Sequence, residues 1–494
     1  MADADSICDL FDSLAINDDD DNADRNVLVP KCQEMCPREE MLFREKNGLL
    51  HRLELIDPSA DNWQRYRASV ASVAKSSGRI RGGRGNDHLQ RHQPQQGRNH
   101  GQLPASSSFT NSKRAVKYFR RSSAGQELTV AEHLRPSAVL RATVDYLLDE
   151  LPARHLMGLI TNGSSSTSLA NTFPTFYDFV FDRLRAVRQD MVVQRLVDAN
   201  CLYILERCVH FYAYSHYTWH QQQCSPKEEN KSPEHLSSSS SFDAHLNSVH
   251  LGECLQLLLA YYDHFQGWLW STRRPVFEAA FLVFNFTTTA TNCHGPSSEA
   301  LKRYQRLQRS PFADDLFAHP LMKTAKAVLL ASLVGNHIRA LRLVSEVYNS
   351  SSSQKRSHQL FPIIFVVSGS LSTVHLQLLR AIAVGYRSPA TTQLPLQSLA
   401  TDWFCPFPAR PSSVARYLEL LAKSYGLAVK TNEPADCFNF TEDRAAPTRS
   451  LMIQKELPLP VSQWRLPRQP QLLHPLGWLP NDRLPTVYQR FQQI

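Results

Sequence analysis

The stretch FYDFVFDRLRAVRQD at residues 176–190 most constrains the fold, because it places closely spaced charges beside an apolar stripe. Apolar side chains recur there at steps of three and four residues, which predicts one face of a helix. Five of its charged residues matter here: Asp182, Arg183, Arg185, Arg188 and Asp190. An unpaired buried charge is costly, so these side chains should be paired, and Asp182 and Arg185 share one flank. The pattern predicts a structural charged helix, although a solvated face with ordinary ion pairs would show the same periodicity.

The composition is that of an intracellular globular protein with room for two or three domains in 494 residues. No run approaches the roughly 20 apolar residues that cross a bilayer. The N-terminus lacks the basic-then-apolar order of a signal peptide. The ten cysteines are scattered, which favours reduced thiols over a disulfide framework.

Charge is unevenly distributed along the chain. Residues 1–28 contain nine Asp and one Arg, a net charge of −8, so the remaining residues must carry +16 for the chain to reach +8. This separation predicts an acidic tail that screens a basic surface or binds a basic partner. A tail that only keeps the protein soluble would have the same composition.

A linker rich in Ser, Gly, Gln and Arg follows at residues 69–112. It has too few apolar residues to offset the entropy of ordering, so we expect disorder. Within it, RIRGGRG places Arg79, Arg81 and Arg84 among glycines. Such arginines suit contacts with phosphates and bases of single-stranded nucleic acid, although short Arg/Gly segments also occur in plain linkers.

Helical periodicity dominates the centre of the chain. We expect a short helix at 115–119 and longer ones at 136–151, 174–219 (with a break near Ala199), 249–270, 298–307, 319–334 and 338–348. Helix–turn–helix pairs of this kind predict an α-solenoid. No fixed-length repeat is visible, so the solenoid should be irregular. Near the N-terminus, Pro37 should open a further helix that continues to Pro58.

The C-terminal third changes from helices to strands. Helices are expected at 394–403 and 412–425, followed by strands at 427–430, 437–440 and 450–455, an order that fits a winged-helix module. Such a module can place its second helix in a nucleic-acid groove, although many bind only protein. Its candidate nucleic-acid contacts are Arg416, Lys423, Lys430, Arg444 and Arg449.

Motifs of catalysis are missing from the sequence. It has no Gly-x-Ser-x-Gly turn, no partnered Cys and His, and no Walker or Gly-x-Gly-x-x-Gly loop. Cys32 and Cys36 lack a second pair at zinc-site spacing. A further group, more typical of a helix core than of metal ligands, comprises Cys201, Cys208, His210, His216 and His220. We therefore expect no enzymatic activity and no catalytic, metal or cofactor site.

Five blocks together resemble the Sac-three/GANP domain family. They are KCQEMCPREEMLFREK (31–46), VKYFRRSSAG (116–125), LRPSAVLRATVDYLL (134–148), the charged helix, and VGNHIRALRL (334–343). The resemblance runs from about residue 31 to 455. That family contains scaffold subunits of the nuclear transcription-and-export complex and shorter relatives linked to centrosome duplication. The chain lacks the extra regions of the long members, including their acetyltransferase region, so the short relatives are the closest match.

The resemblance implies a mainly α, PCI-like helical-repeat domain followed by a winged helix. The implied parts are an acidic disordered tail (1–28), an N-terminal helical segment (31–68), the linker (69–112), a helical core with Ser-rich insertions (113–388), a winged-helix-like module (389–457) and a Pro-rich tail (458–494).

The function that this resemblance implies is a non-catalytic scaffold in centrosome duplication, spindle assembly and mitotic progression, located at the centrosome, the spindle and the nucleus. The alternative is a subunit of a nuclear mRNA-export complex that contacts RNA or DNA through the basic linker and winged helix. Implied protein partners are a PCI-type helical-repeat subunit, a small acidic subunit, and centrosomal or spindle proteins.

Overall fold

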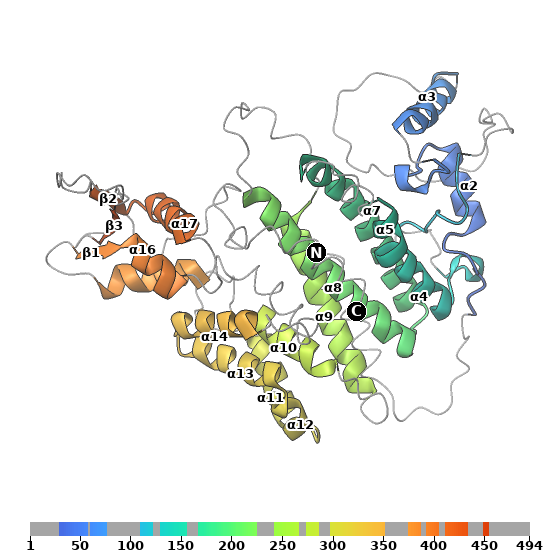
Figure 1. Ribbon diagram of the computed structural model, residues 1–494. Helices are drawn as coiled ribbons and strands as arrows, with labels where there is room; N and C mark the ends of the chain where they lie inside the picture. The colour runs from blue at the N-terminus through green and yellow to red at the C-terminus, as the bar shows by residue number, and fades with distance from the viewer. Residues whose placement is uncertain are drawn as a thin grey trace. The chain divides into compact units, whose positions relative to one another are not determined.

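The computed structural model describes residues 29–57, 60–76, 109–121, 129–155, 166–224, 242–265, 273–285, 297–350, 374–386, 392–404, 411–432 and 448–453. These residues are mainly helical, which confirms the expected fold class at this level (Figure 1). The chain forms two compact units, Met1–Ile204 and Leu205–Ile494. The boundary between these units falls inside one helix, Ala199–Cys224.

The first two described helices of the first unit are joined by a connection that contains a tight turn and a 3-10 turn. Helix α2 (Arg38–Lys46) starts after Pro37 and ends where Gly48 adopts a left-handed backbone with φ of 72°. The Leu49 amide then donates to the Arg44 carbonyl at 2.8 Å, which satisfies a carbonyl at the helix end. A single helix to Pro58 was expected, and this is wrong because Gly48 ends α2 and a 3-10 turn, η1 (Arg52–Glu54), follows.

Helix α3 (Ala60–Ser76) packs on the turn between α2 and η1. Leu50, Leu55 and Tyr66 form a small buried cluster here, and the Leu50 amide donates to the Tyr66 hydroxyl at 3.2 Å. Because α3 continues to Ser76, it extends into the segment predicted as a linker from residue 69. The rest of that segment up to residue 108 lies outside the described residues.

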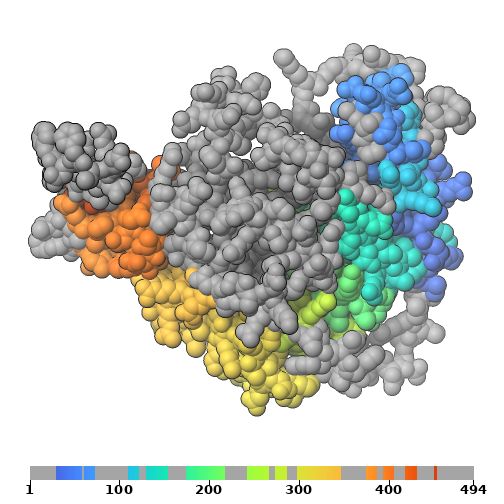
Figure 2. Space-filling model, in the orientation of Figure 1, coloured from blue at the N-terminus to red at the C-terminus, as the bar shows by residue number. Residues whose placement is uncertain are grey.

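The remaining helices of this unit carry the charged stretch. They are α4 (Ser137–Asp145), a π-helical turn η3 (Tyr146–Glu150), α5 (Leu151–His155), α7 (Ser166–Val193) and the start of α8 (Ala199–Cys224). The predicted break near Ala199 is confirmed, with Arg195 in a left-handed conformation between α7 and α8. Val180, Leu184 and Val187 are fully buried, as the apolar stripe predicted. Residues 29–76 (blue) and 109–155 (cyan to teal) lie side by side in Figure 2.

The second unit continues with paired helices. They are α9 (Ala244–His264), α10 (Arg274–Phe284), α11 (Ser298–Gln308), α12 (Ala313–Ala318), α13 (Pro320–Leu333) and α14 (His337–Ser350), and residues 374–385 are also helical. Asp243 and Ser297 cap α9 and α11 by accepting backbone N–H groups. Helix α13 packs against both α10 and α14, and Gly335 turns the chain between α13 and α14 with φ of 74°.

Short helices and a small sheet follow in the second unit. The elements are β1 (Thr392–Pro395), α16 (Leu396–Leu399), the π-helical turn η5 (Ala400–Phe404), α17 (Pro411–Ser424), β2 (Ala428–Asn432) and β3 (Thr448–Ile453). The sheet is antiparallel in the order β1-β3-β2, with Leu451 opposite both Leu394 and Val429. A helix was predicted from Leu394, which is wrong because Leu394 and Pro395 pair with β3. The strand predicted at 437–440 and the tail at 458–494 lie outside the described residues.

Candidate functional site, a buried ionic network

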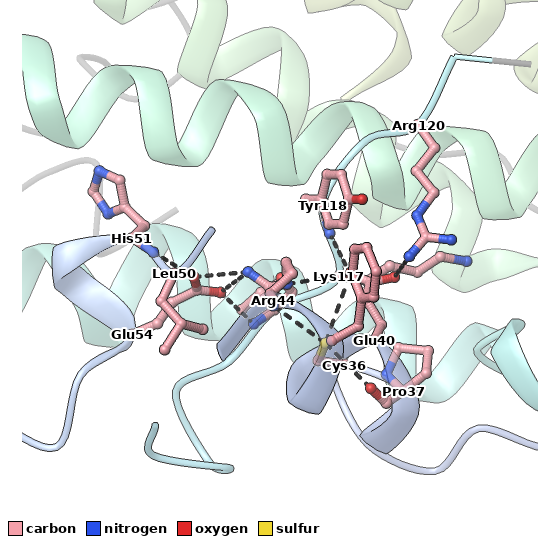
Figure 3. A network of polar contacts seen from close by, with 12 residues as sticks. Cys36, Pro37, Glu40, Arg44, Leu50, His51, Glu54, Lys117, Tyr118 and Arg120 are labelled. Carbon is pink, nitrogen blue, oxygen red and sulfur yellow. Dashed lines mark hydrogen bonds and ion pairs between the residues drawn. The ribbon is translucent and has the colours of Figure 1, made fainter. Parts of the chain in front are cut away.

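A buried ion pair between Arg44 and Glu54 forms the centre of a polar network in the first unit (Figure 3). The two residues are 1% and 0% exposed. Arg44 Nη1 donates to both carboxylate oxygens of Glu54 at 2.8 Å. The turn η1 holds Glu54 in a capping box, in which the carboxylate also accepts the His51 amide at 3.0 Å. Two charges are tolerated at this depth because each satisfies the other.

Helix α7 supplies a second cation to the same carboxylate. Arg183 Nη2 lies 3.3 Å from Glu54 Oε2, and its guanidinium also pairs with Asp182 and covers the Phe179 ring. Burial raises the pKa of Glu54, but the charges of Arg183 and Arg44 outweigh burial and lower it to about 2. Glu54 therefore stays ionised at neutral pH and links η1 to α7.

Cys36 and Glu40 extend the network at the start of α2. Arg44 Nη2 donates to Cys36 Sγ at 3.3 Å, and Cys36 Sγ lies 3.7 Å from Glu40 Oε1. Burial, reinforced by the Glu40 charge, raises the pKa of Cys36 to about 12. Because the reactive form of cysteine is the thiolate, this protonated thiol is suited to packing and hydrogen bonding rather than to nucleophilic chemistry.

An extended segment, residues 115–121, passes between α2, η1 and α7. Its backbone N–H groups donate to carboxylates: Val116 to Glu54 at 3.1 Å, Tyr118 to Glu40 at 3.0 Å and Phe119 to Asp182 at 3.2 Å. The Val116 carbonyl accepts from Arg44 Nη2 at 3.1 Å. The short helix predicted here is wrong, because these backbone groups bond to charged side chains instead of to one another.

The last acidic residue of the charged helix, Asp190, anchors two further segments. It is 1% exposed and accepts Lys117 Nζ at 2.6 Å and Arg135 Nε at 2.7 Å. Arg135, which is fully buried just before α4, also donates to the Met35 carbonyl at 3.2 Å. One carboxylate thus joins α7, the extended segment and the entry to α4.

The five residues singled out on the charged helix have different environments. Asp182, Arg183 and Asp190 lie in the network, and the Arg185 guanidinium stacks 3.8 Å above the centre of the Phe119 ring. Arg188 is 8% exposed. Arg44, Glu54 and Arg135 were not singled out from the sequence. The nearest signals were two blocks of the family resemblance, residues 31–46, which contain Arg44, and residues 134–148, which contain Arg135.

A second buried network, which sequence reasoning missed, lies in the second unit. Arg274 and Arg303 are shared between two carboxylates, Asp263 and Glu278. Arg274 lies 2.5 Å from Asp263 and 3.2 Å from Glu278, and Arg303 Nε donates to Glu278 at 2.9 Å. Glu278 is fully buried. A sequence signal did exist, because Arg274 and Glu278 stand four residues apart in the otherwise apolar α10.

The described side chains of the Cys and His residues singled out on α8 are buried in the protein core. Cys201, Cys208, His210 and His216 are buried, and the side chain of His220 lies outside the described residues. Burial lowers the pKa of His210 to about 3 and that of His216 to about 4, so both are neutral at physiological pH. Among the described residues, no three His, Cys, Asp or Glu side chains are grouped to hold a metal ion.

The predicted nucleic-acid contacts are only partly described. Lys423 on α17 and Lys430 on β2 are exposed, and Lys423 pairs with Glu419 at 2.6 Å. Arg416 belongs to α17 and Arg449 to β3, where it stands opposite Thr431. The others, Arg79, Arg81, Arg84 and Arg444, lie outside the described ranges.

The helices that the structure describes include none with the length and apolar character of a membrane span.

Comparisons with known proteins place this geometry in context. The family model described as SAC3/GANP family matches residues 90–405. The chain is 27% identical to Protein xmas of Drosophila melanogaster over 155 residues, 31% of this chain and 6% of that protein. It is 32% identical to SAC3 family protein 1 of Schizosaccharomyces pombe over 98 residues, 20% of this chain and 8% of that protein. The chain thus spans a small part of either relative. Arg44 and Glu54 precede the matched residues, whereas Arg183 and Asp190 lie within them.

Proposed function

Because this chain belongs to the SAC3/GANP family, we propose that it is a non-catalytic scaffold whose helices assemble with other proteins. The match over residues 90–405 confirms the resemblance to that family and includes four of the five sequence blocks, all except residues 31–46, and this match carries the proposal. The chemistry of the described interior supports it. Glu54, Asp190 and Glu278 are buried and tied to arginine or lysine, which suits them to holding helices together.

The cellular role that we infer first is in a nuclear, transcription-coupled mRNA-export complex. The family resemblance supports it, since scaffold subunits of such a complex belong to this family. The expected partners are a PCI-type helical-repeat subunit and a small acidic subunit. Centrosome duplication, spindle assembly and mitotic progression, which were the first expectation from the short relatives, remain a prediction with a centrosomal or spindle location and now rank second.

Affinity purification of the tagged full chain from interphase and mitotic cells, with nuclease throughout, tests these roles. Export factors and helical-repeat subunits in interphase would support the export role. Centrosomal or spindle proteins in mitosis would support the second prediction instead. Coexpression with the PCI-type and small acidic subunits, followed by size exclusion, tests assembly directly. Separate elution at low salt would contradict the scaffold proposal for these partners.

Nucleic-acid contact is a second candidate function, favoured by the C-terminal elements. The order β1, α16, α17, β2, β3 with a three-stranded antiparallel sheet supports a winged-helix interpretation, and its Lys423 and Lys430 are exposed. If both bind phosphates, Lys423→Ala with Lys430→Ala should lower the log–log salt dependence of RNA or DNA affinity by about two.

A matched control uses an exposed lysine of a different element. Lys302 on α11 is paired with Glu299 at 3.1 Å, much as Lys423 is paired with Glu419. Lys302→Ala should leave the salt slope unchanged. An unchanged slope in the Lys423/Lys430 double variant would contradict a role for this module in binding phosphates.

A further inference from the structure

Helix α2 is amphipathic in the reverse sense of an ordinary surface helix. Surface helices of globular proteins normally turn their apolar face inward. The buried residues of α2 are instead Glu40, Arg44 and Glu45, while Leu42 and Phe43 are 51% and 43% exposed. A helix that buries its charges and exposes its large apolar side chains requires a physical cause.

That cause is the ionic network, which fixes the rotation of α2 about its axis. Arg44 is held by Glu54, and Glu40 accepts the Tyr118 amide at 3.0 Å. Glu45 accepts the Phe109 amide at 2.6 Å and the Thr110 amide at 3.2 Å. Turning α2 to bury Leu42 and Phe43 would remove all these partners at once. The apolar side chains therefore face outward.

The outer α2 surface consists of Arg38, Leu42, Phe43, Lys46 and Leu49. Arg38, Leu42 and Lys46 stand four residues apart in turn, and Phe43 stands three residues before Lys46, so these four share the outer side of the helix. Leu49, 51% exposed, follows directly after the end of α2, where its amide bonds to the Arg44 carbonyl. Two cations thus flank three exposed apolar side chains, and the exposed Glu39, which lies 3.3 Å from His133 Nε2, stands on the same side. Grouped exposed apolar side chains rimmed by polar ones are typical of binding surfaces.

Residues 1–28 of the same chain have the complementary chemistry. Ile7, Leu10, Phe11 and Leu14 recur at steps of three and four, which would align them on one side of a helix. Nine Asp surround and follow them, including an unbroken run at residues 18–21. An apolar stripe in an acidic segment matches an apolar surface flanked by Arg38 and Lys46.

The connection between the two segments is short enough to favour contact within one chain. Fourteen residues, 15–28, separate Leu14 from Val29, and extended they reach up to about 50 Å. Helix α2 begins only nine residues beyond Val29 and, with nine residues, is about 13 Å long. Tethering at this distance gives an effective concentration on the order of millimolar, so weak complementarity suffices.

We propose that residues 7–14 dock as an amphipathic helix on the outer α2 surface of the same molecule. Leu10 and Phe11 pack against Leu42 and Phe43, and the following aspartates approach Arg38 and Lys46. This is the helix-on-apolar-surface mode of peptide recognition, supplied here in cis. It accounts for the exposure of Leu42 and Phe43, and it gives the acidic segment a specific binding surface. The proposal does not depend on the cellular role proposed above.

Zero-length carbodiimide cross-linking of the full chain, read by mass spectrometry, tests the proposal. The expected product is an amide between the Lys46 ε-amine and an aspartate of residues 9–24. Lys31, next to the acidic segment in sequence, reports proximity that needs no docking. Leu42→Ser with Phe43→Ser should lower the ratio of Lys46 to Lys31 products at least about tenfold, given what an apolar contact contributes. Leu10→Ser with Phe11→Ser should do the same from the other side of the contact.

Two controls complete the experiment. Leu330→Ser with Leu333→Ser, which removes comparably exposed leucines of α13, should leave the ratio unchanged. A mixture of isotopically heavy and light protein shows whether the cross-linked partners belong to one chain. Products joining heavy to light chains would overturn the proposal in favour of a second copy. Absence of Lys46 products, or equal yields in the Leu10/Phe11 variant, would overturn docking altogether.

Discussion

Single buried carboxylates in this protein hold together segments that are far apart in the sequence. A buried ion costs several kcal/mol unless a counter-ion compensates it. Asp190 meets this requirement with two cations, Lys117 and Arg135, and Glu54 does so with Arg44 and Arg183. Removing one such carboxylate leaves two cations buried, so single substitutions should have large effects.

Asp190→Asn should lower the free energy of unfolding by about 3–5 kcal/mol, because Lys117 and Arg135 would lose their common counter-ion. Urea denaturation followed by circular dichroism measures the change. Asp182→Asn is the matched control on the same helix. Its side chain is 31% exposed, so its loss should stay near about 1 kcal/mol. Equal effects of the two substitutions would contradict the special position of Asp190.

Glu54 should make stability fall in acid. Its pKa is about 2 when folded against an ordinary 4.5, so its contribution is complete above pH 4.5 and is lost as pH falls towards 2. The shift corresponds to about 3 kcal/mol. The difference in melting temperature between the wild type and Glu54→Gln should therefore be large at pH 7 and shrink as the pH drops below 4.5. A constant difference across that range would contradict this role.

His51 should add a second contribution to the pH dependence of stability, at a higher pH than Glu54. Burial and then the nearby Arg183 lower the pKa of His51 to about 4 from an ordinary 6.5. Its contribution is therefore complete above pH 6.5 and is lost as pH falls towards 4. The Glu54 charge raises the pKa of His51, so Glu54→Gln should lower that pKa further and change this contribution as well.

At the scale of elements, helix ends and ion pairs within helices decide how the segments meet. Gly48 both turns the chain out of α2 and lets α3 approach, since a Cβ there would lie 2.4 Å from Val70 Cγ1. Gly335 has the same left-handed backbone, but a Cβ there would meet no atom within 4 Å. A Cβ at Gly385 would also meet no atom within 4 Å, and the backbone of Gly385 is not left-handed. The three glycines therefore separate backbone strain from steric contact.

Substituting alanine at these three positions should give graded effects on stability. Gly48→Ala should be the most destabilising, because strain and clash add. Gly335→Ala should cost about 1 kcal/mol from the left-handed backbone alone. Gly385→Ala, at the end of a helical stretch, should be neutral or stabilising by up to about 1 kcal/mol. Thermal melts order the three variants, and a milder effect at Gly48 than at Gly335 would contradict the close packing of α3.

The second network should matter as much to its helices as the first. Glu278→Gln leaves Arg274 and Arg303 with Asp263 as their described carboxylate partner, so a loss of about 3–5 kcal/mol is expected. Glu299→Gln removes an exposed partner of Lys302 and should cost less than about 0.5 kcal/mol. Denaturation curves of the two variants test this contrast. A small effect at Glu278 would mean that the second network contributes little to the free energy of unfolding.

At the scale of the whole molecule, residues 31–57 pack into the first unit although the family match begins at residue 90. Residues 36–54 contact residues 116–120 and α7 through backbone and side-chain bonds that join segments far apart in sequence. A protein starting at residue 90 would leave Arg183 without Glu54. The folded unit is therefore larger than the matched region.

Cleavage within residues 77–108 should leave this unit assembled. Trypsin cutting at Arg79, Arg81 or Arg84 should give two fragments that elute together in native buffer and separate only in denaturant. The expectation follows from the Arg44, Glu54 and Arg183 contacts, which cross the cut. Glu54→Gln should release the N-terminal fragment at a lower urea concentration. Separation of the wild-type fragments without denaturant would contradict the argument.

Much of the architecture was predictable because it depends on local periodicity. The apolar stripe of α7, the break before α8 and the Gly335 turn all follow from residues within a few positions of one another. Family membership was predictable for a related reason, since several blocks occur in the expected order. The charged residues of α7 could be singled out as structural, but their partners could not be identified.

Strongly periodic helices such as α7, and the need of the α7 charges for partners, could be derived from the sequence alone, because both follow from side-chain spacing and the cost of burying charge. Only the tertiary structure decided which partners they meet. Residues 115–121 are extended, and Thr392–Pro395 is a strand, because each bonds to groups more than 50 residues away. Helix α2 faces inward with its charges for the same reason. The rotation of α2 about its axis is set by Glu54 and the extended segment and not by the hydrophobic pattern of α2 itself.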